Sequence, residues 1–577
     1  MDPWERIVRT SANLFWRPDV TAIMQRIFII GGFTLLLVSS TAVAAASHLA
    51  VRGIVTDESG RPIRGALVTA TAGDKSVSVF SQQNGGYEMA IPDGNYHVSA
   101  DAYGFGAEAR TIDTRKSTNV NFHLKPAWDI TYLSGAEIEN LLPDNPQTRL
   151  IRGSCTDCHN LNALTHKRGA TSAEWRNFLP QMPRDRLALP QSWDSATFAA
   201  FGNALGQYFG PDATFLGPNS QRPPANVIMH KNISDEVLSA RITEYTVPSD
   251  KAMVHSIMVD SKGEFAWFSE FDFPSNKVGR FDIKQEKFDE YALPIPRSAP
   301  HTGLIGKDGR FWVTLDGEHA AKLAAVDRTT GKITQYEWPE KQRLDNRTLA
   351  MDGAGNLWLA GSDNDELWNF DMETKQFKSW KFPVPQDYSE DSLGTWLKVP
   401  GQPPSQVSAW SYHVVVDSKG VVWFSQLILG TIVSLDPHTG KTRAYKPSGA
   451  PSIRGLLVDG EDNIWFCAFH GHKIGELNPK TGEIKEFQPP TTNATPYGMV
   501  QDRKNGYIWF SDLNGNNITR FDPKTKEFIE YPIPTPDASP RFISIDPMGR
   551  VWFGEFFAGK IGVVDPDGLR REVALAK

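Results

Sequence analysis

The sequence predicts a mainly β protein with a seven-bladed β-propeller at the C-terminus, preceded by a small β-sandwich and a small α-helical domain. Three observations predict this order. A tryptophan recurs at a nearly constant interval after residue 240, short alternating strands with glycine turns occupy residues 47–126, and helical patterning surrounds a cysteine-histidine motif in residues 127–225. At 577 residues the chain is long enough for several domains.

The first 46 residues read as an export signal. Arg26 and three earlier arginines precede an uncharged apolar run, Ile27–Val38, and the small residues Ala42–Ala46 follow it. The run holds about a dozen residues, whereas a membrane-spanning helix needs about 20. We therefore expect cleavage, a periplasmic or secreted protein, and membrane contact only through the signal peptide before it is removed.

Residues 47–126 predict the sandwich. The stretch Val51–Val68 alternates around a Ser-Gly turn, and residues 84–87 and 92–96 supply further glycine turns. This segment resembles the carboxypeptidase regulatory-like domain, an all-β module of exported proteins. The resemblance implies a spacer, with carbohydrate or surface binding as the alternative, and no catalytic role.

Residues 127–225 contain the run Cys155-Thr-Asp-Cys158-His159. C-x-x-C-H is the attachment signature of a c-type haem, in which both thiols form thioether bonds and the histidine supplies the proximal imidazole. The alternatives are a redox dithiol or half of a zinc site. A zinc site needs a second ligand pair at finger-like spacing, and the one other cysteine is Cys467. We expect one covalent haem c.

The residues after this motif predict a haem pocket. A capping box at 171–174 begins a helix whose apolar stripe covers 175–179, and a second stripe at 198–208 marks a closing helix. Met182 follows between two prolines. This arrangement resembles the short class of cytochromes c, which implies Met182 as the sixth iron ligand. His166 is the rival ligand, and Met182 packing in the core is the other alternative.

The propeller prediction depends on a repeated tryptophan. Seven segments place it in a short apolar strand, and their spacing is 42 to 46 residues except for one step of 65. The tryptophans are Trp267, Trp312, Trp358, Trp423, Trp465, Trp509 and Trp552. About four short strands per unit at this period indicate a seven-bladed propeller over 240–577. The long step contains an insertion at 385–408, which we interpret as a functional loop.

Ring closure has two candidate segments. Residues 242–247 precede the first unit and residues 569–573 follow the last. We expect the N-terminal strand to pair with the last blade, and the sequence leaves open which segment forms the outer edge.

The repeat combines P-x-G-I/L, W-F-S/T-E/D, K-I/V-G-R and an outer strand of the form I-x-E-Y-x-L/I-P. It resembles the streptogramin lyase family, also called virginiamycin B lyase. That family is a seven-bladed propeller that opens a cyclic depsipeptide antibiotic by β-elimination, with a histidine base and a magnesium ion. The resemblance implies the fold, whereas the activity has to be argued from the site.

The opening strand of each blade begins with a polar residue, and some of the tryptophan strands end in carboxylates. The polar residues are His255, His301, Arg347, His413, Arg454, Tyr497 and Arg541, and the carboxylates are Glu270, Asp316, Asp512 and Glu555. Such a ring is suited to bind a polyanion, a metal or a carbonyl group. The alternative is a water-filled channel in which these groups satisfy one another. His470 and His472, on a loop of the same face, are interpreted as a solvated pair, with metal binding by this H-x-H pair as the alternative.

The resemblance also implies catalytic residues. The turn at Pro300-His301-Thr302-Gly303 resembles the turn of the family's catalytic histidine, His255 occupies the matching place one blade earlier, and Asp316 lies four residues after a repeat tryptophan. His301 would then be the general base and Asp316 a magnesium ligand. This chain departs from the pattern at Ala299, where the family has a metal-binding glutamate.

Three functions fit these features. The first is an exported c-type cytochrome that transfers electrons while the propeller mouth binds a periplasmic redox partner or a small-molecule or peptide substrate. The second is a metal-dependent C–O lyase, and the third is a non-catalytic periplasmic binding scaffold. We rank the redox function first because haem has no use in β-elimination. The net charge of −7 and the lack of a basic block argue against nucleic-acid binding.

Overall fold

The computed structural model describes residues 48–156, 159–179, 195–214, 216–219, 221–223, 233–271, 275–317, 321–338, 346–361, 366–382, 409–448 and 452–569. The predicted signal peptide, the 385–408 insertion, Cys158 and Met182 lie outside these residues. No helix in the described part of the chain is both long and apolar enough to cross a membrane.

Two small sheets form the N-terminal part of the structure. The strands are β1 (His48–Asp57), β2 (Leu67–Ala72), β3 (Lys75–Phe80), β4 (Gly86–Pro92), β5 (Asn95–Asp101), β6 (Glu108–Asp113) and β7 (Phe122–Leu124). One sheet has the order β4-β1-β7 and the other contains β3-β2-β5-β6. Alternating side chains from both sheets, such as Val51, Val68 and Phe122, share one buried core. The predicted strand alternation is therefore present.

A helical segment follows. It contains η1 (Ile130–Tyr132), α1 (Gly135–Leu141), α2 (Pro146–Cys155), η2 (Leu161–Lys167), α3 (Ser172–Phe178) and α4 (Ser195–Phe209). The predicted capping box begins α3, where Thr171 accepts from the Glu174 amide and Glu174 accepts from the Thr171 amide. α4 packs against α2 and α3 around a core that includes Trp175 and Leu205. Both predicted helices are confirmed.

The rest of the described chain is built from short strands after η5 (Val237–Ser239). The first sixteen strands are β8 (Arg241–Thr246), β9 (Val254–Val259), β10 (Phe265–Glu270), β11 (Lys277–Asp282), β12 (Lys287–Ala292), β13 (Pro300–Ile305), β14 (Phe311–Leu315), β15 (Ala321–Val326), β16 (Ile333–Glu337), β17 (Asn346–Met351), β18 (Leu357–Gly361), β19 (Glu366–Phe370), β20 (Phe377–Lys381), β21 (Ser411–Val416), β22 (Val422–Gln426) and β23 (Thr431–Leu435). The others are β24 (Thr442–Tyr445), β25 (Ile453–Val458), β26 (Ile464–Ala468), β27 (Lys473–Leu477), β28 (Ile484–Phe487), β29 (Pro496–Gln501), β30 (Ile508–Asp512), β31 (Asn517–Phe521), β32 (Phe528–Pro532), β33 (Ile543–Ile545), β34 (Val551–Glu555) and β35 (Lys560–Asp565).

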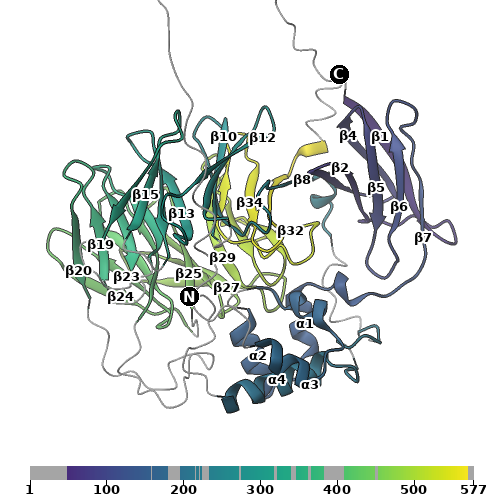
Figure 1. Ribbon diagram of the computed structural model, residues 1–577, viewed down its shortest axis with the longest axis horizontal. Coiled ribbons are helices and arrows are strands. Elements are labelled where there is room, and N and C mark those ends of the chain that lie inside the picture. Colours follow the sequence, from purple (N-terminus) through teal and green to yellow (C-terminus); the bar gives the residue numbers. More distant parts are fainter. Residues whose placement is uncertain are drawn as a thin grey trace, which may run out of the picture. The chain divides into compact units, whose positions relative to one another are not determined.

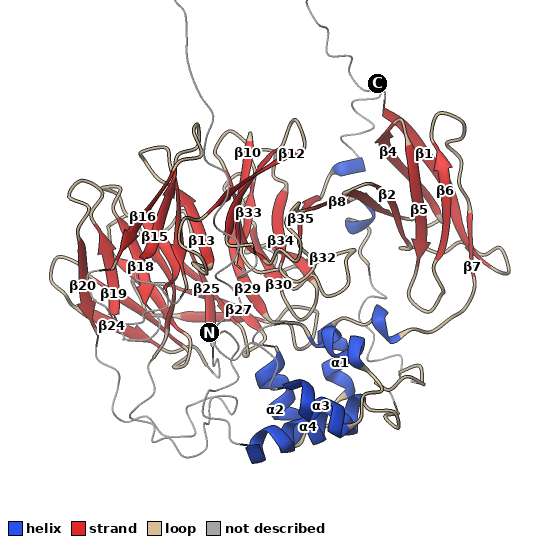
Figure 2. Ribbon diagram, in the orientation of Figure 1, coloured by secondary structure: helices blue, strands red, loops and turns tan. Residues whose placement is uncertain are grey.

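From β9 to β32 these strands pair as successive antiparallel sheets of four (Figure 1). The first strand of each sheet contacts the first strand of the next, through β9, β13, β17, β21, β25, β29 and β33, and β33 contacts β9. Figure 2 shows the strand-rich character of this region. The architecture is therefore propeller-like, with sheets that follow one another around a common centre.

The repeated sequence motifs have a direct structural cause. The indole Nε1 of Trp423 donates to Asp417 at 3.0 Å, and Trp358, Trp465 and Trp552 make the same bond to an aspartate six residues earlier. The glycine of K-V-G at Gly279 lies opposite Phe268, and a Cβ there would be 2.0 Å from the Phe268 ring. The aspartate therefore holds the turn to the tryptophan strand, and the glycine leaves room for an aromatic ring from the neighbouring strand.

The last sheet continues into the sandwich. Its eight strands have the order β33-β34-β35-β8-β3-β2-β5-β6. β8 is the outer strand of the last propeller-like unit, a position for which the sequence offered two segments. One edge of β8 pairs with β35, and its other edge pairs with residues Lys75 to Val79 of β3. Leu569, from the competing C-terminal segment, packs against the sandwich core instead. The backbone pairing of β8 on both sides therefore joins the sandwich to the propeller-like part.

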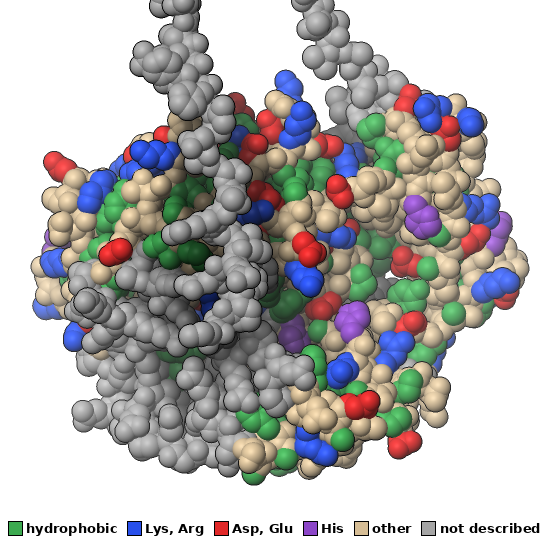
Figure 3. Space-filling model, in the orientation of Figure 1, with side chains coloured by type: hydrophobic (Ala, Val, Ile, Leu, Met, Phe, Trp, Pro, Cys, Tyr) green, Lys and Arg blue, Asp and Glu red, His purple; other side chains and the backbone are tan. Residues whose placement is uncertain are grey.

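Positively and negatively charged side chains are mixed on the face of the molecule that Figure 3 draws. On the described part of the face drawn in Figure 3, basic and acidic side chains alternate without a gathering of one sign.

Candidate functional site

Strand pairing places one polar residue of each opening strand at an equivalent position, and we call this set the mouth ring. Its members are His255, His301, Arg347, Tyr412, Arg454, Tyr497 and Arg541. The prediction of His413 as a member was wrong. Ser411 pairs with Gln426 just as Ile453 pairs with Ala468, so Tyr412 is equivalent to Arg454, and His413 lies one residue further along.

His255 and His301 form a close pair in the mouth ring. Their side chains are 0% and 1% exposed, and their ring centroids lie 3.8 Å apart. The rings of Phe271, Phe542 and Phe556 surround His255 at 5.3 to 5.7 Å. Neither ring nitrogen of His255 has a hydrogen-bond partner among the described residues. The two residues predicted as catalytic are therefore brought together in a mostly aromatic environment.

Both imidazoles are held in the neutral form. Burial lowers the pKa of His255 and of His301 well below its usual value, and the guanidinium groups of Arg347 and Arg541 lower it further. A neutral imidazole can donate from one nitrogen and accept at the other. The pair can therefore hold or pass a proton, although it is a weak base.

Tyr412 and Tyr497 form a second pair. Their hydroxyl groups hydrogen-bond to each other, and the Tyr497 hydroxyl also accepts from Arg541 Nη1 at 3.3 Å and Arg454 Nη1 at 3.4 Å. Burial raises the pKa of Tyr412. Burial alone would raise the pKa of Tyr497 too, but the guanidinium groups of Arg541 and Arg454 lower it below its ordinary value.

Asp316, the predicted magnesium ligand, follows β14 and is engaged by an arginine. Its Oδ2 accepts from Arg347 Nη1 at 2.6 Å. The described residues contain no group of three or more His, Cys, Asp or Glu side chains that could hold a metal ion. Glu318 and His319, which lie close to Asp316 in the sequence and could supply further ligands, are outside the described residues. The described neighbours of Asp316 thus supply a cation rather than additional oxygen ligands.

Two of the other predicted carboxylates, Glu270 and Glu555, are buried, and neither has a hydrogen-bond partner for its carboxylate oxygens among the described residues. Burial raises the pKa of Glu270 to about 7, and its charged neighbours are Glu290 and Lys277. Burial also raises the pKa of Glu555, whose charged neighbours are Glu244 and Lys560. Each of these two carboxylates therefore has one acidic and one basic neighbour on the outer strands of its sheet.

His159 of the C-x-x-C-H motif lies near the mouth ring. Cys155 is buried at the end of α2, and the His159 ring lies 5.9 Å from that of Phe557. Phe557 contacts Phe556 at 4.8 Å, and the Arg541 guanidinium lies 3.7 Å from the Phe556 ring centroid. His159 Nδ1 is 2.8 Å from the Asn160 carbonyl oxygen. The motif and the mouth ring are thus linked by two adjoining phenylalanines.

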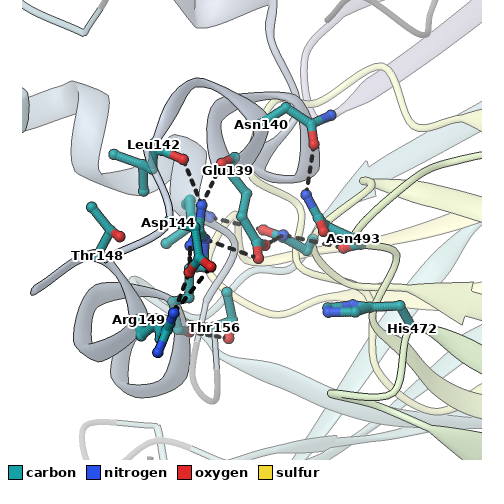
Figure 4. Close-up of polar contacts among 12 residues, drawn as sticks. Glu139, Asn140, Leu142, Asp144, Thr148, Arg149, Thr156, His472 and Asn493 are labelled. Atoms are coloured by element: carbon teal, nitrogen blue, oxygen red, sulfur yellow. Dashed lines mark hydrogen bonds and ion pairs between the residues drawn. The ribbon is translucent and has the colours of Figure 1, made fainter. Parts of the chain in front are cut away.

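Hydrogen bonds hold the helical segment on the strand loops. Asn514 donates from Nδ2 to Glu139 at 2.9 Å, and its Oδ1 accepts from the Leu161 amide at 3.2 Å. Asn493 donates to Asn140 at 2.8 Å (Figure 4). A Cβ on Gly135 would lie 2.2 Å from Asn514 Oδ1, so this close approach requires glycine.

His470 and His472 belong to the same contact region. Thr156 Oγ1 lies 3.3 Å from His470 Nε2, and His472 Nδ1 lies 2.9 Å from the Ala494 carbonyl oxygen. Burial lowers the pKa of both histidines. The predicted solvated pair is therefore half-buried, and His470 lies against Thr156 of the helical segment.

Sequence reasoning missed Tyr412, Phe557 and Asn514. No motif marks Tyr412, because Ser411-Tyr412-His413 lacks the P-x-G pattern of Pro496-Tyr497-Gly498, and only the strand pairing shows that the two tyrosines are equivalent. No local signal marks Phe557 or Asn514, because their partners lie more than 350 residues away in the sequence. Met182 lies outside the described residues and His166 is exposed on η2, so the predicted sixth iron ligand stays a prediction.

Comparisons with known proteins support the fold. Residues 402–577 match the model of the Virginiamycin B lyase family, and residues 50–125 match that of the Carboxypeptidase regulatory-like domain. These matches support a virginiamycin B lyase-like propeller and a carboxypeptidase regulatory-like domain. No curated protein matches the chain.

Three solved structures are similar in part. A streptogramin B lyase is 22% identical, with a TM-score of 0.49, over 57% of this chain and 99% of the lyase. A virginiamycin B lyase from Staphylococcus aureus is 22% identical, with a TM-score of 0.47, over 56% and 99%. The extracellular domain of a putative hybrid two component system from B. thetaiotaomicron is 17% identical, with a TM-score of 0.41, over 55% and 40%.

Proposed function

We propose that this chain is an exported c-type cytochrome in which a haem beside the mouth of a seven-bladed propeller exchanges electrons with a substrate or partner bound there. The observation that carries the proposal is the position of His159, whose ring lies 5.9 Å from Phe557 and which has Arg541 of the mouth ring among its electrostatic neighbours. The C-x-x-C-H motif therefore lies where chemistry at the mouth ring could reach it.

Three residues of the motif would hold a covalent haem. Cys155 and Cys158 would hold the porphyrin and His159 the iron. If His159 Nδ1 donates to the Asn160 carbonyl oxygen, Nε2 is the nitrogen left for iron, which is the usual arrangement of a metal-binding histidine. Trp175 Nε1 and Asn160 Nδ2 are buried without a hydrogen-bond partner among the described residues, which suits a group with polar edges. Bound haem supplies one-electron transfer at iron.

The chain's own residues would bind and orient the substrate. The neutral His255 and His301 imidazoles can donate or accept one hydrogen bond each, and Arg454 and Arg541 attract negative charge. Phe557 is 41% exposed beside His159 and offers an apolar contact. These groups favour a small polar or anionic molecule, or a partner protein that presents such a group.

Seven blades account best for the strand order. The repeat contains seven tryptophans, one in each unit. The contact of β33 with β9 supports a ring of units that is closed. With β8 on the outer edge, the last blade is the one that adjoins the sandwich. The sandwich would then act as a spacer in the periplasm or outside the cell.

The test is a visible absorption spectrum of the full chain made in a host competent for c-type maturation. Wild type should carry covalent haem that is reversibly reduced. Cys155→Ala with Cys158→Ala should abolish haem staining on a denaturing gel, whereas Cys467→Ala should keep it, because Cys467 is fully buried in β26. Covalent haem in the double variant would overturn the assignment.

Axial ligation has its own test. We propose Met182 as the sixth ligand because a thioether there matches the short cytochromes c, with His166 as the rival. Met182→His should lower the reduction potential, since a methionine ligand raises it. If Met182→Ala leaves the spectrum unchanged and His166→Ala alters it, both axial ligands are histidines.

A lyase is the second candidate, and the match of residues 402–577 to the lyase family favours it. His301 would then be the general base and Asp316 the magnesium ligand. The ion pair of Asp316 with Arg347 and the buried Ala299 weigh against a magnesium site. A chain without haem or turnover would leave the third candidate, a binding scaffold.

A further inference from the structure

The Tyr497 hydroxyl is crowded by hydrogen-bond donors. Arg541 Nη1 and Arg454 Nη1 donate to it at 3.3 and 3.4 Å, and the Tyr412 hydroxyl lies within hydrogen-bond distance. A guanidinium can only donate, and a neutral phenol has one proton to give. Tyr497 must therefore either direct its proton to Tyr412 or carry none and accept from all three groups.

The surrounding charges favour the second arrangement. The titratable and charged groups that face Tyr497 are Tyr412 from β21, Arg454 from β25, Arg541 ahead of β33, Arg347 from β17 and His255 from β9. The Arg454 and Arg541 guanidiniums lie 5.0 and 5.3 Å from the Tyr497 ring centroid. Opposite charge at this range stabilises an anion, and here it outweighs burial, which by itself raises the pKa of Tyr497.

The two tyrosines are not equivalent. The pKa of Tyr412 is raised by burial, whereas the pKa of Tyr497 is lowered by its arginines. When the environment separates two titratable groups in this way, one serves as the base and the other as the acid. Tyr497 is the member suited to be the base.

We propose that Tyr497 is the proton-accepting group of the mouth ring, a buried phenolate held by Arg454 and Arg541 with Tyr412 as its hydrogen-bond donor. Such a base takes a proton from an acidic O–H or N–H group: that bond breaks, the proton moves to the Tyr497 oxygen, and the electron pair stays on the substrate atom. The anion left behind is the more readily oxidised form. This rests on the proposed function and names its substrate class as small molecules with an ionisable O–H or N–H group.

The test is carbon NMR of the full-length, reduced protein labelled at the tyrosine Cζ. Of the 14 tyrosines, one should give a phenolate resonance at neutral pH. Tyr497→Phe should remove it. Tyr531→Phe is the matched control, because Tyr531 is also fully buried and its hydroxyl donates to Glu236.

The arginines give a second, graded readout. Arg454→Gln should raise the pH at which the Tyr497 resonance titrates by about 1 to 3 units, because an opposite charge is lost. Arg520→Gln should leave it unchanged, since Arg520 pairs with Glu236 away from the mouth ring. If Tyr497→Phe does not fold, Arg454→Gln and Tyr412→Phe still report, because each removes a donor to the same oxygen.

Two results would overturn the inference: no phenolate resonance at neutral pH, or one that persists in Tyr497→Phe. The proposed function fails separately, through absence of covalent haem. A phenolate in a protein without haem would support the base and overturn the cytochrome. Haem with every tyrosine neutral would do the reverse.

Discussion

The imidazole rings of His255 and His301 lie 3.8 Å apart, on opening strands of neighbouring sheets, with almost no solvent exposure. Two cations at this separation would repel strongly in a buried site. The lowered pKa values of both residues have the same origin, because burial and nearby guanidiniums add to that repulsion. Folding therefore requires that the pair stays neutral.

This pair should make stability depend on pH. The folded pKa values lie below the unfolded value of about 6.5, so below that pH the unfolded chain binds protons that the folded chain does not. Each histidine then costs about 1.4 kcal/mol of stability per pH unit as the pH falls. His255→Phe should reduce this loss, measured as urea unfolding between about pH 5 and 7.5. His438→Gln, at an exposed turn, is the control, and equal slopes for wild type and His255→Phe would contradict the prediction.

The glycine of the K-V-G repeat should tolerate no side chain. Gly279→Ala would place a Cβ 2.0 Å from the Phe268 ring, so the strands must separate. Overpacking of this kind costs about 1 to 3 kcal/mol. Gly353→Ala is the matched control, because nothing lies within 4 Å of a Cβ there. Thermal unfolding should show a lower Tm for Gly279→Ala alone.

Asn514 should control how the helical segment is held. Asn514→Ala leaves the buried Glu139 carboxylate and the Leu161 amide each without one hydrogen bond, at a cost of about 1 to 3 kcal/mol. We expect faster proteolysis of residues 130–209. Asn463→Ala removes a side-chain hydrogen bond to Asp459 within a turn and should not change that rate. Equal cleavage in both variants would contradict the docking role.

Magnesium should have no catalytic effect. Because Asp316 is paired with Arg347, wild type should not open cyclic depsipeptides when magnesium is added. Ala299→Glu alone should not create activity, since Ala299 is buried in an apolar cluster with Phe271 and Phe556. Turnover in wild type that disappears in His301→Ala would show that the lyase function is the correct one.

Local patterns predicted most of the fold. Each repeat contains its own turn and tryptophan strand, so the four-stranded sheets can be read from residues within one unit, as Trp423 and Asp417 illustrate. The helix at 172–178 was predicted for the same reason, because its capping box is a contact between residues three apart. The choice of β8 as the outer edge was not readable, since two segments had suitable composition.

The site was predicted in part. Equivalent positions in the repeat identified His255, His301, Arg454, Tyr497 and Arg541 before any contact was known. The sequence pointed to His413 instead of its neighbour Tyr412. The register of a strand is set by its pairing partner, and a shift of one residue turns a side chain to the other face of the sheet. The pairing of Asp316 with Arg347 also escaped prediction, since the two residues belong to different sheets.

The sequence by itself determined the repeat, the export signal pattern, the C-x-x-C-H motif and the residue types available to the mouth ring. These are short-range features, which hydrophobic period, turn chemistry and spacing encode directly. Only the tertiary structure decided that His159 lies beside Phe557, that Asn514 contacts Glu139 and that Tyr412 meets Tyr497. Those contacts join residues 85 to 398 positions apart, and such pairs are selected by the packing of whole sheets and helices against one another rather than by any local pattern.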